Sequence, residues 1–432
     1  MNAPQPAGPD VGAPPDLVAD VELADGMADL PNPGPDGVRR GRAWLLARLH
    51  TEPLGLVTVP LGDGLAAADI AAAVWRQCSE AITRRWPDAD PGRLVSGAGP
   101  AGPTAFPAGR RAALDDGPAV TVVVCTRERP GPLRVCLDSL ARQTYPRTRI
   151  LVVDNAPTSA ATAEVVAAHT GPHPVRRIVA TTPGLSHARN RALAEVDTEL
   201  VAWIDDDEIA DRHWVTEVVR GFAERPDAAG MSGLVVPAEI ATAAQAWYEA
   251  FGGHSKGRGF TPAVFDPGQM RQSPLYPLPP FGVGANMAFR TAALRDIGGF
   301  DPALGAGAPA CGGEDTAIFT WLLLTGRTML YRPSAVVRHF HRRDEAALHA
   351  QLHGYGVALT AFYASLLRRR PGLLWPLLGL APTALRDVAS PGSLRNVGVR
   401  DGMPPELMRA NLRGMAVGPW RYVRGVLGGR RG

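Results

Sequence analysis

The stretch VTVVVC, residues 120–125, is a short apolar run rich in β-branched side chains. Such a run is typical of a strand that is buried on both faces of a parallel sheet. Segments with helical spacing separate it from three further apolar runs, RILVVD (149–154), RRIVA (176–180) and LVAWID (200–205). This alternation predicts repeated βαβ units, and therefore an α/β fold with a mostly parallel sheet flanked by helices.

Acidic side chains follow two of the predicted strands. Asp154 ends the second strand, and Asp205, Asp206 and Asp207 end the fourth. Ligands of open α/β sheets bind outside the carboxyl ends of the strands, so we expect these acids to line one crevice. If the chain stays extended, Asp205 and Asp207 point the same way and Asp206 faces elsewhere. Two converging carboxylates form an oxygen site of the kind that holds Mg²⁺ or Mn²⁺. A solvated acidic turn or a helix N-cap is the alternative interpretation.

Two later motifs carry further groups of this chemistry. In GGEDTAIFTWLLLTG, Glu314 and Asp315 begin an apolar helix. The helix dipole favours negative charge there and keeps a carboxylate ionised, as a base requires. The motif VVRHFHRR places His339 and His341 on alternate positions of a predicted strand. An imidazole beside two carboxylates favours Mn²⁺ over Ca²⁺. Taken alone, each motif also fits an ordinary helix start or a pair of surface histidines.

Three other segments supply weaker candidates, each of which could also be a surface or packing position. They carry polar side chains, or glycines where the backbone can approach a ligand closely. The candidates are Thr126, Arg127 and Glu128 after the first strand, Arg189 and Asn190 in PGLSHARNRAL, and Gly284 and Asn286 in FGVGANMAFR.

The overall composition is that of an ordinary globular protein. Of the 432 residues, 45% are hydrophobic and 20% are charged, and the formal net charge of +3 is too small to indicate binding to nucleic acid. Cys78, Cys125, Cys136 and Cys311 include no CxxC pair, which argues against a structural zinc site or a disulfide framework. The sequence shows no signal-peptide pattern and no run of about 18 apolar residues, so we expect a cytoplasmic protein.

Shifts in composition divide the chain into five parts. Residues 1–37 are rich in Pro, Gly, Ala and Asp and are predicted to be a disordered tail. Residues 38–90 form a small accessory module, with helices at GRAWLLARLH and LAAADIAAAVWRQCSEAITRRW and a strand at LGLVTVPL. Residues 91–117 are a predicted linker, 118–345 the α/β domain, and 346–432 a helical, arginine-rich region.

Eight motifs occur in the order in which they are found in a known family. They are VVVCTRERP, ILVVDNAP, PGLSHARNRAL, IDDD, GANMAFR, GGFDPALG, GGEDTAIF and VVRHFHRR, and they span roughly residues 118–345. On these motifs the chain resembles the family 2 glycosyltransferases of the GT-A fold, in a form common in actinobacteria. Each motif is loose, but the ordered set of eight is specific.

The resemblance implies a role for each group of residues. Thr126, Arg127 and Asp154 correspond to the positions that hold the nucleotide base. The wider set of nucleotide-sugar-binding residues is Thr126, Arg127, Glu128, Asp154, Arg189, Asn190, Asp205 and Asp206. Asp205, Asp207 and His339 would hold a divalent metal, with His339 fitting better than His341. Glu314 and Asp315 are the catalytic pair, with Asp315 as the base, and Gly284 and Asn286 would bind the acceptor.

The implied reaction is an inverting displacement of hexosyltransferase type, with Mn²⁺ or Mg²⁺ as cofactor. The donor would be a UDP-, GDP- or dTDP-linked sugar. The acceptor would be a glycan, a lipid-linked molecule or a small molecule, in cell-envelope polysaccharide, glycolipid or secondary-metabolite glycosylation. The chain has no QxxRW motif after the ED motif, so it departs from the processive synthases.

Three alternatives stay open at this point: a sugar nucleotidyltransferase, an inactive sugar-nucleotide-binding scaffold, and a metal-dependent hydrolase. The segment LLRRRPGLLWPLLGL mixes arginines with a tryptophan and leucines, as an interfacial membrane segment does. We expect it to dock onto the catalytic domain. If the acceptor is lipid-linked, peripheral contact with the inner face of the cell membrane would follow.

Overall fold

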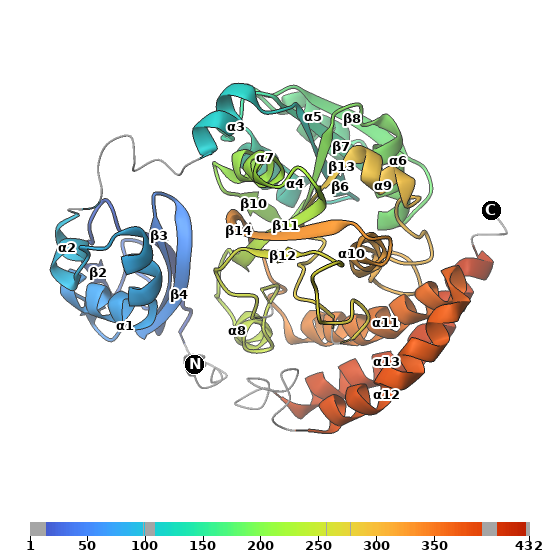
Figure 1. Cartoon of the computed structure of the whole chain (residues 1–432). Helices are drawn as coiled ribbons and strands as arrows, with labels where there is room; N and C mark the ends of the chain where they lie inside the picture. The colour runs from blue at the N-terminus through green and yellow to red at the C-terminus, as the bar shows by residue number, and fades with distance from the viewer. Residues whose placement is uncertain are drawn as a thin grey trace.

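The largest element of the computed structural model is a nine-stranded sheet in the order β10-β14-β11-β13-β9-β6-β7-β8, with β12 beside β14 (Figure 1). The structure describes residues 14–97, 99, 109–255, 257–276, 278–390 and 404–428. The strands of this sheet are β6 (Val120–Thr126), β7 (Thr148–Asn155), β8 (Val175–Ala180), β9 (Leu200–Asp205), β10 (Glu208–Ala210), β11 (Ala228–Pro237), β12 (Ala263–Phe265), β13 (Asn286–Arg290) and β14 (Thr328–His339).

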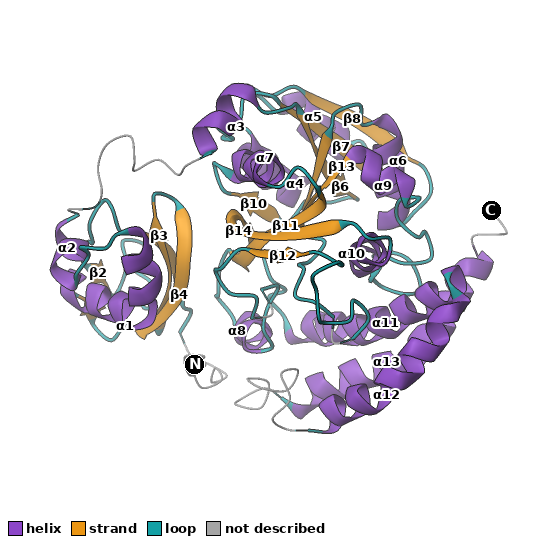
Figure 2. Ribbon diagram, viewed as in Figure 1, coloured by secondary structure: helices purple, strands orange, loops and turns teal. Residues whose placement is uncertain are grey.

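The four strands predicted from the sequence form one half of this sheet, and all of them pair in parallel, in the order β9, β6, β7 and β8. In the other half, β13 runs antiparallel between β9 and β11, and β11 pairs in parallel with β14. Helices cover the sheet on both sides (Figure 2). The predicted fold class, an α/β sheet flanked by helices, is therefore confirmed.

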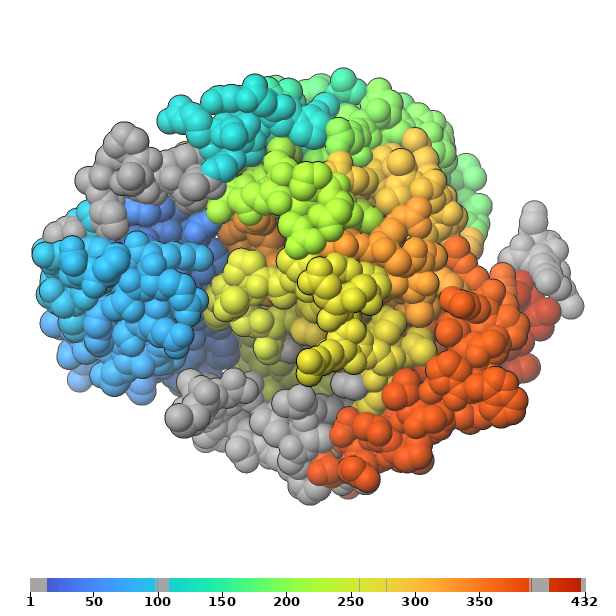
Figure 3. All heavy atoms as spheres, in the orientation of Figure 1, coloured from blue at the N-terminus to red at the C-terminus, as the bar shows by residue number. Residues whose placement is uncertain are grey.

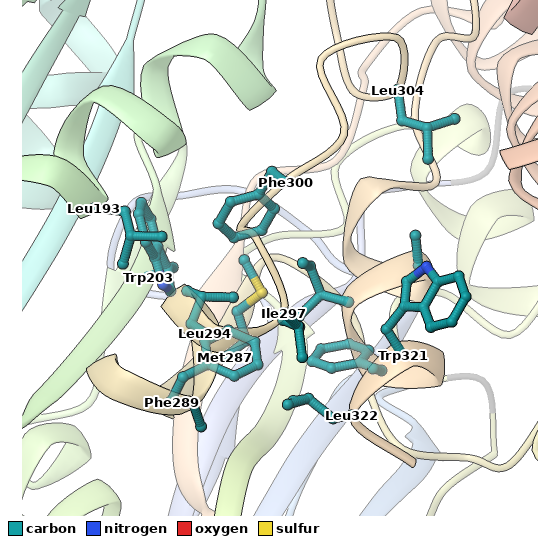
Figure 4. Close-up of a cluster of buried hydrophobic side chains, with 14 of the residues drawn as sticks. Leu193, Trp203, Met287, Phe289, Leu294, Ile297, Phe300, Leu304, Trp321 and Leu322 are labelled. Carbon is teal, nitrogen blue, oxygen red and sulfur yellow. The ribbon is translucent and has the colours of Figure 1, made fainter. Parts of the chain in front are cut away.

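Each face of the sheet has its own apolar core. Val122 and Val124 of β6 face one core, and Val123 faces the other, because alternate residues of a strand point to opposite faces. The first core is covered by α4 (Pro130–Leu140), α5 (Ala161–Ala168) and α7 (Trp214–Glu224). The second is covered by α6 (Leu185–Glu195), α9 (Thr291–Asp296) and α10 (Glu314–Leu324). In the second core, Trp203 and Phe300 meet edge to face at 5.4 Å (Figure 4).

A separate module forms the N-terminal part of the structure, seen in blue in Figure 1. Its elements are β1 (Leu17–Glu22), β2 (Leu30–Pro31), β3 (Arg42–Leu49), β4 (Glu52–Pro60), β5 (Gly64–Leu65), α1 (Ala67–Arg85) and α2 (Pro91–Ser96). The helix predicted at LAAADIAAAVWRQCSEAITRRW corresponds to α1, and the strand predicted at LGLVTVPL corresponds to β4. Both predictions agree with the structure.

The prediction of a helix at GRAWLLARLH is wrong, because this segment is strand β3. It forms an antiparallel hairpin with β4, and His50 and Thr51 make the turn with positive φ angles of 51° and 67°. One face of β3 packs in the core of the module, and the other packs against the α/β domain. Burial on both faces gives a continuous apolar run, which periodicity cannot distinguish from a buried helix.

Two predicted boundaries also need correction. The described part of the predicted tail, residues 14–37, belongs to the module, because β1 pairs in parallel with β3. Alternate apolar residues of β1 pack on the module core despite the surrounding Pro and Gly. Residues 1–13 of that tail lie outside the described residues. The predicted linker contains α2 and also α3 (Arg110–Asp116), which packs on α7.

The module is fixed to the α/β domain by apolar and charged contacts. Leu46 of β3 joins Leu234, Val236 and Val336 of the large sheet in one cluster. Ion pairs link Arg48 to Asp211 at 2.7 Å and Arg220 to Glu52 at 2.6 Å. This combination of apolar contact and ion pairs holds the module against β11 and β14.

The C-terminal part consists of long helices, drawn orange to red in Figure 1. They are α11 (Glu345–Arg369), the short 3₁₀ helix η2 (Pro371–Leu373), α12 (Leu374–Ala389) and α13 (Pro405–Gly428). α13 runs parallel to α11, so closely that a Cβ on Gly414 would lie 2.1 Å from the carbonyl oxygen of His353. α8 (Ala243–Ala250) completes the described helices. Across the described ranges, no helix combines the length and the apolar character needed to cross a membrane.

A buried ion pair on α3 ties three parts of the chain together. The Arg110 Nε donates to Glu217 of α7 at 2.7 Å, and its Nη1 donates to Thr51 Oγ1 in the β3–β4 turn at 2.9 Å. Burial works to raise the pKa of Glu217, but Arg220 and Arg110 outweigh it, and the pKa lies below its usual value of 4.5. The carboxylate is therefore ionised at neutral pH and depends on its arginines.

We predict that Arg110→Ala lowers the free energy of unfolding at neutral pH by about 3 kcal/mol, because Glu217 loses a buried partner but keeps Arg220. A carboxyl whose pKa is lowered in the folded state stabilises above its unfolded pKa and loses that effect as the pH falls. The difference between variant and wild type should therefore shrink below about pH 4.5. Urea unfolding at several pH values measures this. The exposed neighbour Arg111→Ala is the control, and an equal loss in both variants contradicts the assignment.

Candidate active site

One cavity of about 680 Å³ opens at the carboxyl ends of β6 and β9. The start of α10, the segment 278–285, the end of β14 and one side of α11 complete its wall. Ten residues singled out in the sequence line this cavity. They are Thr126, Arg127, Arg189, Asp205, Asp206, Asp207, Gly284, Glu314, Asp315 and His339.

The three consecutive aspartates are held by different partners. Asp206 accepts from Thr126 Oγ1 at 2.7 Å and also pairs with Arg129. Asp207 pairs with Arg129 Nη2 at 2.9 Å through one oxygen, and its other oxygen lies 3.6 Å from His339 Nε2. The expectation that Asp206 faces away from the site is wrong. β9 ends at Asp205 and the chain turns before β10, so the alternation of an extended strand does not continue.

The three aspartates have different pKa values because their surroundings differ. Burial raises the pKa of Asp205 to about 6, and Arg189 opposes this. Burial likewise raises the pKa of Asp206 to about 7, against the effect of Arg129. For Asp207 burial is outweighed by His339 and Arg129, and the pKa lies below its usual value. Asp207 is therefore the most acidic of the three, and Asp205, with a pKa of about 6, is also mostly ionised at neutral pH.

Arg189 connects the acidic turn to the start of α10. It is buried, its Nη1 donates to Glu314 Oε1 at 2.8 Å, and its Nη2 lies 3.4 Å from Asp205 Oδ1. It also donates to the carbonyl oxygen of Gly284 at 3.3 Å. Burial raises the pKa of Glu314 to about 7, although the arginine opposes this. Glu314 thus acts mainly as the partner of Arg189.

Asp315 faces the cavity from the first turn of α10. Its Oδ2 accepts from the backbone N–H of Gly284 at 2.6 Å, and its Oδ1 accepts from the N–H of Thr316 at 2.7 Å. A Cβ on Gly284 would lie 2.9 Å from Asp315 Cβ, closer than real Cβ contacts allow. Glycine at position 284 therefore lets the backbone hold this carboxylate in place.

A chain of hydrogen bonds runs away from the acidic turn through two histidines. His339 Nδ1 lies 2.8 Å from His341 Nδ1, and His341 Nε2 lies 2.7 Å from Glu249 Oε1. Potential ligand atoms of His254, His339 and His341 also lie within 4.8 Å of one another. Burial lowers the pKa of His339 to about 4, so the ring is neutral and can offer a lone pair to a metal.

Four predicted site residues do not line the cavity. Glu128 accepts from Thr158 and Ser159, and buried Asp154 pairs with Arg177 at 2.8 Å. Asn190 bonds both backbone groups of Phe300, and Asn286 bonds Trp214 Nε1 and the carbonyl oxygens of Leu234 and Ala335. All four side chains are engaged in holding elements together. For Asn190 and Asn286 these bonds use both the oxygen and the nitrogen of the side-chain amide.

Six further residues that line the cavity were not predicted from the sequence: Arg129, Asn155, His254, Arg258, Arg342 and Tyr355. Three of them had a usable signal. Arg129 lies in the motif VVVCTRERP, Arg342 lies in VVRHFHRR, and Asn155 follows Asp154 at the end of β7. His254 and Arg258 lie in a long segment with little regular structure between α8 and β13, where no periodic pattern marks a site. A long loop inside a compact domain is itself a sign of function.

Residues 121–298 match the family model described as glycosyl transferase family 2. Together with the ordered motifs and the cavity, this match shows that the chain carries a family 2 glycosyltransferase domain. The prediction of this family is confirmed.

Two curated relatives are similar over part of their length. The chain is 29% identical over 272 residues to a pre-mycofactocin glycosyltransferase of Mycobacterium tuberculosis, which covers 60% of this chain and 50% of the relative. It is 29% identical over 234 residues to the succinoglycan biosynthesis protein ExoM of Rhizobium meliloti. This match covers 53% of this chain and 69% of that relative. The chain thus spans about half the length of the mycobacterial relative.

Solved structures of similar shape are more distant. The mannosyltransferase PcManGT of Pyrobaculum calidifontis, in complex with GDP-Man and Mn²⁺, has a TM-score of 0.45 at 19% identity and covers 84% of this chain and 91% of that chain. S. aureus TarS in complex with UDP-GlcNAc has a TM-score of 0.41 at 15% identity. This match covers 71% of this chain and 92% of that chain. Both are too distant to indicate which ligands this chain binds.

We predict that Arg189→Met lowers the free energy of unfolding by about 3 kcal/mol, because it leaves the buried Glu314 and the half-buried Asp205 without their cation. The matched control is Arg191→Met on the same helix, whose exposed side chain forms a surface ion pair with nearby Glu195. That control should cost less than about 0.5 kcal/mol. Chemical denaturation measures both, and equal losses would show that Arg189 is not a structural centre.

Proposed function

We propose that this chain transfers a sugar from a nucleoside-diphosphate sugar to an acceptor hydroxyl, with inversion at the anomeric carbon and with the help of a divalent metal. One observation carries the proposal. Asp207, His339 and Asp315 all line the same cavity. A metal ligand pair and a candidate base on one cavity suit a reaction between two bound substrates.

The residues present fit a divalent cation. Asp207 Oδ1 and His339 Nε2 are 3.6 Å apart and supply an ionised carboxylate and a neutral imidazole. Asp205 is a third oxygen donor on the cavity wall. This mixed set suits Mn²⁺ or Mg²⁺ better than Ca²⁺. When bound, the cation would offset negative charge on the diphosphate.

The ring of His339 is held by the histidine chain. If Glu249 accepts the Nε2–H of His341, then the Nδ1 of His341 is an acceptor and receives the Nδ1–H of His339. The Nε2 of His339 is then unprotonated and faces Asp207. We infer that Glu249 and His341 are positioning residues, which set the tautomer that a metal needs.

Cationic side chains around the cavity suit an anionic donor. Arg127, Arg129, Arg258 and Arg342 all line it, alongside the acids. Their positive charge would stabilise the diphosphate as it leaves. In this proposal the arginines stabilise the leaving diphosphate, and Asp315 acts on the attacking hydroxyl of the acceptor.

Asp315 is the proposed base. Its carboxylate is fixed by the N–H groups of Gly284 and Thr316. The acceptor oxygen forms a bond to the anomeric carbon, its proton passes to Asp315, and the bond from that carbon to the phosphate oxygen breaks. This direct displacement inverts the configuration. The retention of Asp207 and Asp315 on the cavity wall favours transfer over a scaffold that only binds a nucleotide sugar.

The acceptor class stays open within this proposal. One curated relative is named for pre-mycofactocin and the other for succinoglycan biosynthesis. A screen of UDP-, GDP- and dTDP-sugars with Mn²⁺ by thermal shift would identify the donor, and nucleoside diphosphate release then reports transfer to candidate acceptors.

We predict that Asp315→Asn reduces transfer by about 10²–10⁴-fold, because the amide cannot take the acceptor proton. Binding of the donor, measured by calorimetry, should stay within about twofold, since the amide oxygen can still accept from Gly284. Asp296→Asn, at an exposed aspartate paired with Arg327, is the control with unchanged activity. Undiminished turnover in Asp315→Asn would exclude this residue as the base.

We also predict that His341→Ala weakens Mn²⁺ binding in the presence of the donor nucleotide by about 10–100-fold, because His339 loses the acceptor that fixes its tautomer. His341→Asn should recover most of the loss, since its amide oxygen lies as far from Cβ as Nδ1 and can accept the same N–H. Calorimetric titration with Mn²⁺ measures both. If wild type binds no metal, the proposed cofactor fails; if both variants bind like wild type, only the positioning role fails.

A further inference from the structure

The two outer C-terminal helices carry apolar side chains on their exposed faces. Trp375 of α12 is 74% exposed and Trp420 of α13 is 63% exposed. Other large apolar side chains of these helices are also exposed: Leu374, Leu378 and Leu385 on α12, and Leu412, Val417, Val423 and Leu427 on α13. These nine are the greater part of the exposed large apolar residues in the described ranges.

These side chains form a stripe on each helix. At 3.6 residues per turn, those of α12 fall within about 100° of the helix circumference and those of α13 within about 140°. The opposite side of each helix packs inward, with Leu377 and Leu380 of α12 against the core and Tyr422 of α13 buried in it. Each helix is therefore apolar on two sides, and only one side is covered by the described residues.

The charge around these stripes is mainly positive. Residues 366–390 and 404–428 contain eight arginines and two acids, Asp387 and Glu406, for a net charge of +6. The whole chain has a formal charge of only +3, so positive charge is concentrated here. Asp387 is bonded to Tyr276 Oη at 2.7 Å, which removes one of the acids from the free surface. Arg413 and Arg424 are exposed beside the stripe of α13.

We propose that the exposed faces of α12 and α13, here called the C-terminal apolar surface, dock this protein onto an anionic lipid bilayer. Tryptophan and leucine beside arginine is the composition of helices that lie in a membrane interface. Anionic headgroups attract each nearby arginine, and most of the arginines here lie just before α12, at residues 368–370, and along α13. Figures 1 and 3 show these helices at the outer margin of the molecule, away from the N-terminal module, where a flat surface can reach them.

This surface adjoins the proposed site through α11. Gln351, Tyr355 and Phe362 of α11 line the cavity, and α13 packs along the same helix. Docking through α12 and α13 would therefore hold the cavity near the bilayer. The inference does not depend on the chemistry of the proposed function, since bilayer binding is measured without substrate.

The test is flotation of the full-length protein with vesicles of phosphatidylcholine, with or without phosphatidylglycerol. The wild type should float with vesicles that contain phosphatidylglycerol and much less with phosphatidylcholine alone. The double variants Trp375→Ser with Leu385→Ser, and Trp420→Ser with Val423→Ser, should each bind at least about tenfold more weakly. Arg413→Gln and Arg424→Gln should each weaken binding to the anionic vesicles by about fivefold.

Val135→Ser on α4 is the matched control, because Val135 is 42% exposed on a different part of the surface. It should bind like wild type, and all variants should keep the wild-type melting temperature, since exposed changes rarely alter stability. Failure of the wild type to float, or undiminished binding by the tryptophan variants, overturns the proposal. Concentration-dependent self-association without flotation, abolished by the same variants, assigns the surface to a second copy and overturns it as well.

Discussion

The candidate active site depends on the hydrogen bonds and ion pairs that the buried guanidinium of Arg189 makes. This guanidinium reaches Glu314 at the start of α10, Asp205 at the end of β9 and the backbone of the segment before β13. Three separate parts of the chain thus meet on one cation, and Phe300 packs against it from the core side at 5.4 Å. Without this charge the acids could not be buried together, and Asp315, one residue along from Glu314, would lose its fixed position.

The arrangement of charge in the cavity follows from the same principle. Burial favours the protonated form of four carboxylates in the cavity, and nearby arginines offset this effect unequally. Asp207 receives the strongest compensation, and Asp206 and Glu314 receive less. At neutral pH Asp207 and most of Asp205 are therefore ionised, whereas Asp206 and Glu314, with pKa values of about 7, are partly protonated. Such an electrostatic arrangement is ready for a cation and a diphosphate, which would take over part of the pairing now supplied within the chain.

The sequence was sufficient to predict the parallel half of the sheet, because strands such as β6 and β7 are buried on both faces and keep a distinctive β-branched run. The end of a predicted strand was enough to expect the acidic turn at a ligand crevice, whereas the link between that turn and the ED pair came from the resemblance of the ordered motifs to a known family. The sequence could not show that β3 is a strand, because burial on two sides removes the alternation that marks strands. Nor could it pair Glu249 with His341 or separate Arg129 from the many other arginines. Those contacts join residues that are far apart in the sequence and are brought together only by the folding of the whole domain.

The docking of the N-terminal module has a practical consequence for any shortened version of the protein. A chain that began at residue 118, where composition alone suggests that the catalytic part starts, would remove both β3 and α3. Leu234, Val236 and Val336 would then face water as an open apolar strip on a sheet. Exposed strips of this kind promote aggregation. A recombinant fragment cut at that point should therefore be poorly behaved even with every cavity residue intact, and a cut that retains β1 onward is the sounder design.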